Sequence, residues 1–237
     1  MTQVKPAENK TPSGFWKIIK KIFLTLIISQ FAYLLFCKWI NPPITITQAV
    51  NAFEGHGLRR DYIDYDDMGR NIKLAVMASE DQLFPDHDGF DIRAIKKAIK
   101  YNNKHPNKTR GASTISQQTA KNIFLWQHGG FFRKGLEVYF TFMIELLWSK
   151  ERILEHYLNI AEMGKGIFGV QAAAKAYFNK DAKNLTRKEA AMIAACLPNP
   201  KKYTVKPACR YVTVRASRIM VQMKHLEGDA DIEALLK

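Results

Sequence analysis

An acidic segment interrupts a strongly basic chain of 237 residues and net charge +14. The segment is "SEDQLFPDHDGFD" at 79–91, and its carboxylates are Glu80, Asp81, Asp86, Asp88 and Asp91. Segments of helical periodicity flank it, so a loop is predicted that holds its carboxylates against rigid elements, as acid and base catalysts often are held. The alternative is a solvated acidic loop in which Asp91 only caps the next helix.

A second polar segment, "GASTISQQTAKN" at 111–122, has no apolar core pattern. Its hydroxyl and amide side chains would be costly to bury unless they bind something. Those side chains are Ser113, Thr114, Gln117 and Gln118, and Lys121 adds a cation beside them. A flexible loop without a ligand is the alternative.

A third group is "RKGLE" at 133–137, where Arg133 and Glu137 lie four residues apart on one face of a predicted helix. This spacing also suits an ordinary salt bridge along a helix. The chemical interpretation therefore depends on which elements bring the three groups together.

Composition favours one sizeable core with an appendage, because 47% of the 237 residues are hydrophobic. A pI near 9.7 predicts an acidic partner, either nucleic acid, an anionic membrane surface or a phosphorylated substrate. The three cysteines, Cys37, Cys196 and Cys209, are too few for a disulfide framework. Buried thiols are expected, although Cys196 and Cys209 could pair outside the cytoplasm.

The N-terminus predicts a membrane anchor. A polar tail at 1–14 precedes an uncharged apolar run at 22–37, and the anchor with its aromatic and lysine flanks covers 15–40. A cleaved signal peptide is the alternative, but bulky residues end the run where small ones would mark a cleavage site. Lysines before the run place the tail in the cytoplasm and the rest outside, which excludes DNA as the acidic partner.

Helical periodicity dominates the remainder, so the expected fold class is mostly α. A linker at 41–70, extended at its start, leads into a domain at 71–237. A helix from Met68 could be capped by Asp66 or Asp67, and Asp91 is the expected cap of the following one. The segment 133–164 is helix-forming throughout, and further helices are predicted at 168–178, 186–198 and 209–226.

Five sequence blocks carry a family resemblance. They are "EDQLFPDHDGFD" at 80–91, "GASTISQQTAKN" at 111–122, "RKGLE" at 133–137, "KERILEHYLN" at 150–159 and "RKEAAMIAACLPNP" at 187–200. In this order and spacing they resemble glycosyltransferase family 51, the peptidoglycan glycosyltransferases. No motif set of a penicillin-binding transpeptidase follows, so the chain looks like a member that carries the glycosyltransferase activity alone.

The resemblance implies a lysozyme-like α-helical domain with a smaller, membrane-facing lobe. It also implies an inverting reaction that joins lipid II to a growing glycan strand through β-1,4 bonds and releases polyprenyl diphosphate. The expected location is the inner (cytoplasmic) membrane, single-pass, with the domain on the periplasmic side. Proteins of cell-wall synthesis complexes would be further partners, and nucleic acid would not.

Matching positions imply the site residues. Glu80 corresponds to the catalytic glutamate, the base for the attacking hydroxyl, and Glu137 to a second important carboxylate. The substrate-binding set is Ser113, Gln117, Lys121, Arg133 and Lys134. No cofactor is expected, although a divalent cation bound to the diphosphate would be compatible with Glu137.

Two positions depart from the family pattern. Ser116 stands where threonine is common, and Gly129 stands where several members carry an arginine. His128 is a candidate substitute for that arginine.

The aromatic segment "IFLWQHGGFF" at 123–132 is predicted to enter the outer leaflet and receive polyprenyl tails. A place in the core is its alternative.

Two other functions remain compatible with these patterns. A lytic transglycosylase would share the fold and a single catalytic glutamate but would cleave glycan. A non-catalytic, membrane-anchored scaffold would share the charge and the anchor.

Overall fold

The computed structural model describes residues 14–106, 108, 110–127 and 129–237. The chain divides into two compact units, Met1–Ile40 and Asn41–Lys237. The first contains helix α1, Gly14–Trp39, whose 26 residues have a mean hydropathy of 1.7 over their most apolar stretch. At 1.5 Å per residue the helix is about 39 Å long. It is therefore long and apolar enough to cross a membrane, as predicted.

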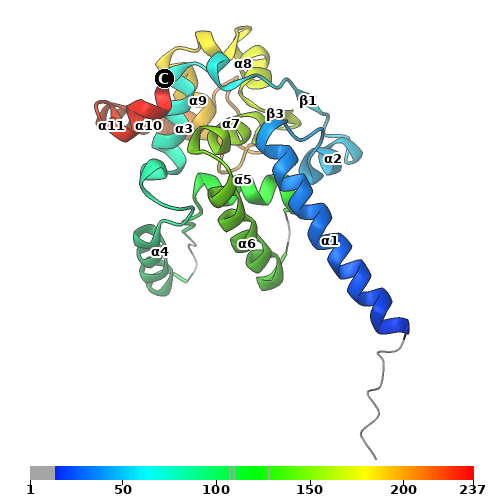
Figure 1. Ribbon diagram of the computed structural model, residues 1–237. Helices are drawn as coiled ribbons and strands as arrows, with labels where there is room; N and C mark the ends of the chain where they lie inside the picture. The colour runs from blue at the N-terminus through cyan, green and yellow to red at the C-terminus, as the bar shows by residue number, and fades with distance from the viewer. Residues whose placement is uncertain (1–13, 107, 109, 128) are drawn as a thin grey trace, which may run out of the picture. The chain divides into compact units, whose positions relative to one another are not determined.

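The second unit is mostly helical, which confirms the predicted class (Figure 1). Its α-helices are α2 Ile46–Phe53, α3 Arg70–Glu80, α4 Ile92–Lys104, α5 Ile115–Phe124, α6 Phe131–Leu147, α7 Lys150–Ile160, α8 Val170–Phe178, α9 Arg187–Cys196, α10 Arg210–Leu226 and α11 Ala230–Leu236. Three short 3₁₀ helices are η1 Tyr65–Asp67, η2 Phe84–Asp86 and η3 Ala182–Asn184.

A small sheet in the order β1-β3-β2 joins the start of this unit to its middle. Its strands are β1 Arg59–Arg60, β2 Glu162–Gly164 and β3 Ile167–Phe168. β1 runs parallel to β3 with Arg59 opposite Ile167, whereas β2 and β3 form an antiparallel hairpin. The 41–70 segment is thereby integrated into the second unit.

Two groups of helices build the core. α3 packs against α9 and α10, and α5 packs against α6 and α7. α9 contributes the buried small side chains Ala190, Ala191, Ala194 and Ala195, which allow its neighbours to approach closely. Figure 1 shows α4 and the N-terminal end of α6 extending away from α8, at the opposite end of the unit. The cleft described below lies where the two groups meet.

The prediction of helix throughout 133–164 was wrong at two points. α7 ends at Ile160, and Glu162–Gly164 form strand β2 instead of helix. α6 ends at Leu147 and α7 begins at Lys150. Ser149 caps α7 by accepting a hydrogen bond from the Arg152 amide at 3.2 Å, and Trp148 is buried beside the break. A local capping residue therefore outweighs the continuous helix propensity.

Two further boundaries differ from the prediction. α3 begins at Arg70 after Gly69, which has no side chain to act as a cap, while Asp66 and Asp67 lie in η1. The start of the linker is not simply extended, because Thr45 and Gln48 form a capping box that starts α2.

Candidate active site

A cleft of about 1100 Å³ lies between the two helix groups. Its walls come from the end of α3, the start of α4, the 110–114 segment, α5, α6 and α10. All seven side chains proposed from the sequence line it: Glu80, Ser113, Gln117, Lys121, Arg133, Lys134 and Glu137. Segments far apart in sequence thus contribute to a single cavity.

Glu80 is the last residue of α3, and its side chain is 13% exposed. One carboxylate oxygen, Oε1, accepts a hydrogen bond from the Ser79 hydroxyl at 2.9 Å and lies 3.5 Å from Nη2 of Arg215. The other, Oε2, accepts from the Gln118 amide at 3.1 Å. Donors surround the carboxylate, so its oxygens are held in a fixed orientation as hydrogen-bond acceptors.

Gln118 is itself oriented by Tyr157 on α7. The Tyr157 hydroxyl lies 3.3 Å from the amide oxygen of Gln118, which leaves the amide nitrogen to donate to Glu80. Burial, and to a smaller extent the Glu80 charge, raises the pKa of Tyr157 well above its ordinary value. The hydroxyl therefore keeps its proton and acts as the donor.

Asp81 has a structural role, although it is adjacent to Glu80. Its two oxygens lie 3.0 and 3.1 Å from Nε2 of His87, and one accepts from the Ile115 amide at 3.0 Å. Nδ1 of His87 accepts a hydrogen bond from the Gly89 amide. Nε2 therefore carries the hydrogen and donates a hydrogen bond to Asp81. The hydrogen bonds of Asp81 therefore link the 81–91 segment to the start of α5.

The other acids of this segment act locally. Asp91 caps α4 by accepting from the Ala94 amide at 2.8 Å, as predicted, while Asp86 and Asp88 are exposed. Gly89 has φ +85°, and a Cβ there would lie 2.7 Å from the Thr141 side chain. The segment therefore packs closely on α6 because this position is glycine.

Lys150 and Glu145 attach the same segment to α6 and α7. Their ion pair measures 2.8 Å, and the Lys150 ammonium also donates to the carbonyl oxygen of His87. The Ser116 hydroxyl donates to the same Glu145 carboxylate. The hydrogen bond to Glu145 needs only a hydroxyl, which serine and threonine both have. Serine can therefore replace threonine at this position.

The "GASTISQQTAKN" segment is not a flexible loop, because α5 starts within it. Thr114 and Gln117 form a capping box, in which the Gln117 amide oxygen accepts from the Thr114 backbone at 3.1 Å. That oxygen is therefore engaged within the protein, and a substrate contact by Gln117 would have to use the amide nitrogen. Ser113 is exposed on the cleft wall, before the helix begins.

Glu137 is the most enclosed carboxylate of the cleft, with only 3% of its surface exposed. Arg133 donates to one of its oxygens at 2.8 Å, and the Lys134 ammonium donates to the other. Both oxygens are thus paired with cations one helical turn away. The i,i+4 salt bridge considered from the sequence exists, and it forms part of the cleft wall.

Lys121 is the cation without a partner at this end of the cleft. Among the described residues its ammonium forms no hydrogen bond or ion pair. Burial lowers the pKa of Lys121 below its ordinary value, the Glu137 carboxylate raises it, and Arg133 and Lys134 lower it. A half-buried, unpaired ammonium beside two further cations is suited to an anionic ligand.

Comparison with known proteins supplies the family. A family model described as Transglycosylase matches residues 47–224. The chain belongs to the transglycosylase family. It is 53% identical over 169 residues to a biosynthetic peptidoglycan transglycosylase of Escherichia coli, covering 71% of this chain and 70% of the relative. The relative of the same name from Aeromonas hydrophila is 45% identical over 210 residues, covering 87% and 89%.

Gly129, where the family resemblance leads us to expect an arginine in some members, lies in close surroundings. A Cβ at Gly129 would lie 2.9 Å from Cβ of Arg133 and 3.1 Å from the Trp126 indole nitrogen. A larger residue would therefore require Arg133 to shift. The proposed substitute, His128, lies outside the described residues.

Metal binding was left open from the sequence. Across the described residues no group of three His, Cys, Asp or Glu side chains converges. A divalent ion bound directly to Glu137 would have to displace Arg133 or Lys134 from the carboxylate.

Sequence reasoning did not assign roles to Gln118, Tyr157 and Arg215 of this transglycosylase. Gln118 was noted only as a polar residue, and Arg215 only as part of a basic helix. Gln118 meets Glu80 across 38 residues of sequence, and Arg215 meets Ser79 across 136. No local pattern encodes such contacts.

The three cysteines are free thiols, and burial raises the pKa of Cys196 to about 12.

Proposed function

We propose that this transglycosylase polymerises lipid II into β-1,4-linked glycan strands, with Glu80 as general base. The observation that carries the proposal is the arrangement of one cleft. A carboxylate oriented by donors lies at the end of α3, and the cations Lys121, Arg133 and Lys134 lie on α5 and α6. Glycosyl transfer from a lipid diphosphate requires both groups.

The reaction assigns each group a step. The 4-hydroxyl of the acceptor GlcNAc attacks the anomeric carbon of the donor MurNAc from the face opposite the diphosphate, so the configuration inverts. The new carbon–oxygen bond forms as the bond to the diphosphate oxygen breaks. Glu80 takes the hydroxyl proton, and the diphosphate leaves with the electron pair of the broken bond.

Lys121, Arg133 and Lys134 stabilise the departing diphosphate, which needs no proton if cations receive its charge. Ser113 and the amide nitrogen of Gln117 lie on the same cleft and provide hydrogen bonds to the donor. Glu137 keeps Arg133 and Lys134 in place, because both donate to its oxygens. It acts through these cations and not on the reacting hydroxyl.

Purified full-length protein incubated with lipid II tests the function directly. Long glycan strands with released polyprenyl diphosphate are expected. Cleavage of preformed glycan to anhydro-sugar products would instead identify a lytic enzyme, and absence of both products would leave only the scaffold function.

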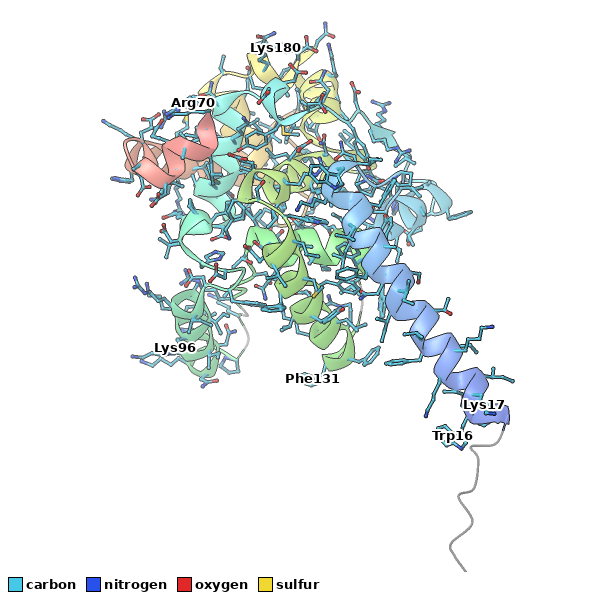
Figure 2. The ribbon with its side chains drawn as sticks, viewed as in Figure 1. Trp16, Lys17, Arg70, Lys96, Phe131 and Lys180 are labelled. Atoms are coloured by element: carbon cyan, nitrogen blue, oxygen red, sulfur yellow. The ribbon has the colours of Figure 1, made fainter. Side chains whose placement is uncertain are left out.

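The N-terminal end of α6 provides an apolar surface suited to the substrate's lipid. Phe131 is 99% exposed and Phe132 76%, and Trp126 lies nearby with 40% exposed. Figure 2 shows Phe131 at the free end of α6, pointing out of the unit. Phe124 and Leu125 instead pack inward. The rings of Phe124 and Phe140 are stacked, with their centroids 4.6 Å apart. The aromatic segment is therefore divided between core and surface.

We predict that replacing Trp126, Phe131 and Phe132 by serine abolishes membrane binding of a chain that begins at Asn41. That chain retains the complete second unit. Removing three exposed aromatic side chains eliminates the apolar area that would enter the outer leaflet. Sedimentation with liposomes containing anionic lipid measures the effect.

A matched control replaces Val214 and Val221 by serine, since both are exposed apolar residues on α10. The control is expected to bind like the parent chain. Unchanged liposome binding by the folded triple variant would contradict the membrane-facing role of this surface.

The orientation of the anchor gives a second prediction. Lys17, Lys20 and Lys21 lie at the N-terminal end of α1, so this end stays in the cytoplasm and residues after Ile40 are exported. A reporter that folds only in an oxidising compartment should be active when fused after Lys237. Activity only of a cytoplasmic reporter at the same position would reverse the orientation.

A further inference from the structure

A second cavity of about 550 Å³ runs along one face of α10. Its lining follows helical spacing and consists of Arg210, Tyr211, Val214, Arg215, Arg218, Ile219 and Gln222, with Ala78 and Ser79 opposite. We refer to it as the α10 groove. None of the roles assigned above to the reaction uses Arg210 or Arg218.

The α10 groove continues from the catalytic cleft. Ser79 and Arg215 line both cavities, and both contact Glu80. Glu80 reaches Gln118 of α5 through its other oxygen. The catalytic carboxylate thus stands between the α5–α6 side, where the diphosphate cations lie, and the α10 side. A substrate bound across Glu80 would extend from the first side to the second.

The groove carries positive charge that the protein does not neutralise. Arg210 and Arg218 are exposed, and in the described part of the chain neither has an ion-pair partner. Arg187, on the neighbouring α9, is by contrast paired with Glu227. Two unpaired guanidinium groups in one cavity favour a ligand with carboxylate groups.

The dimensions suit a short peptide. Arg210 and Arg218 are eight positions apart, which corresponds to about 12 Å along a helix. An extended peptide of about four residues spans a similar length. Between the arginines the groove presents the exposed side chains of Tyr211 and Val214, which suit small apolar groups such as alanine methyls. Tyr211 is held by Tyr203, stacked at 3.8 Å.

An anionic lipid headgroup would offer similar charge, but the groove is in the wrong place for it. The exposed aromatic residues at the end of α6 mark the surface proposed to face the membrane. Figure 1 shows α10 at a distance from that end of α6, and Figure 2 shows Phe131 pointing away from α10. A ligand that leads away from the membrane therefore fits the groove better.

We propose that the α10 groove binds the peptide stem of a MurNAc residue held in the cleft, with Arg210 and Arg218 receiving its carboxylates. The inference rests on the proposed function, because lipid II is the substrate that brings an acidic, alanine-containing peptide to this position. The groove then contributes to substrate affinity and not to the chemical step.

The test compares two substrates with full-length protein. One is lipid II with its acidic stem, and the other is lipid II in which the stem carboxylates are amidated. In the double variant Arg210→Gln, Arg218→Gln, KM for the acidic substrate should rise roughly three- to tenfold, the size expected for two partly exposed ion pairs. Its kcat, and its KM for the amidated substrate, should match those of the wild type.

A control variant, Lys188→Gln, Lys224→Gln, removes the same charge from exposed positions outside both cavities. It should leave KM for both substrates unchanged. Equal KM values of wild type and double variant for the acidic stem would overturn the inference, as would an equal increase with both stems. Loss of binding to anionic liposomes by the double variant of the chain that begins at Asn41, without stem dependence of KM, would assign the groove to lipid headgroups instead.

The same assay separates the inference from the function on which it rests. If wild-type protein makes no polymer from either substrate, the proposed function and the inference both fail. If it polymerises both substrates and the double variant shows no stem-dependent change, only the inference fails.

Discussion

Glu80→Gln lowers the rate of lipid II polymerisation by at least about 10²-fold, the smaller end of the range for loss of a general base. The amide cannot accept the acceptor's proton, but it keeps the size of the carboxylate. Its one oxygen can still accept from the Gln118 amide, while its nitrogen donates to the Ser79 hydroxyl, which can turn to accept. Helical content and affinity for a phosphoglycolipid inhibitor that mimics the substrate should therefore be retained. Turnover and inhibitor binding are measured on the same preparation.

Asp86→Asn is the matched control, because it removes one carboxylate from the same acidic segment at an exposed position. It should polymerise lipid II at nearly the wild-type rate. Near-wild-type turnover of Glu80→Gln would contradict the assignment of Glu80 as the general base.

Glu137→Gln should impair both substrate binding and turnover. The carboxylate is buried and paired with Arg133 and Lys134, so its neutralisation releases both cations from their positions. Breaking a buried ion pair is costly because the remaining charge loses its partner. KM and inhibitor affinity should therefore change together with kcat, in contrast to Glu80→Gln.

The same substitution should alter the pH dependence through Lys121. Lys121 must carry its proton to bind a diphosphate, so activity falls as pH rises through its pKa. Burial already lowers the pKa of Lys121, and the Glu137 charge is what raises it. Without that charge the pKa falls further, and the alkaline limb of kcat/KM moves to lower pH.

Profiles of kcat/KM against pH for wild type and Glu137→Gln measure this shift. An unchanged alkaline limb would mean that Lys121 does not depend on Glu137. A loss confined to kcat, with unaltered inhibitor affinity, would indicate that Glu137 acts on the reacting groups and that the roles of the two glutamates have been interchanged.

Helix prediction from the sequence was successful where apolar periodicity was strong. It failed where hydrogen bonds between polar groups decide where a helix begins. The segment 111–122 has no apolar pattern, yet α5 forms because Thr114 and Gln117 cap it and Gln118 meets Glu80. Likewise, Ser149 starts a new helix inside a continuous helix-forming stretch. Both outcomes depend on hydrogen bonds that periodicity does not record.

The sequence by itself determined the elements that depend on neighbouring residues: the apolar span of α1, the basic composition, and the five ordered blocks with the seven site candidates. Only the tertiary structure decided the use of each side chain. Glu80 and Asp81 are adjacent acids, but Glu80 lines the cleft beside Gln118 and Arg215. Asp81 instead accepts hydrogen bonds from His87 and the Ile115 amide. The physical reason is distance along the chain. A carboxylate's role is set by the donors around it, and here the donors that distinguish the two acids include Ile115, 34 residues from Asp81, and Gln118, 38 residues from Glu80.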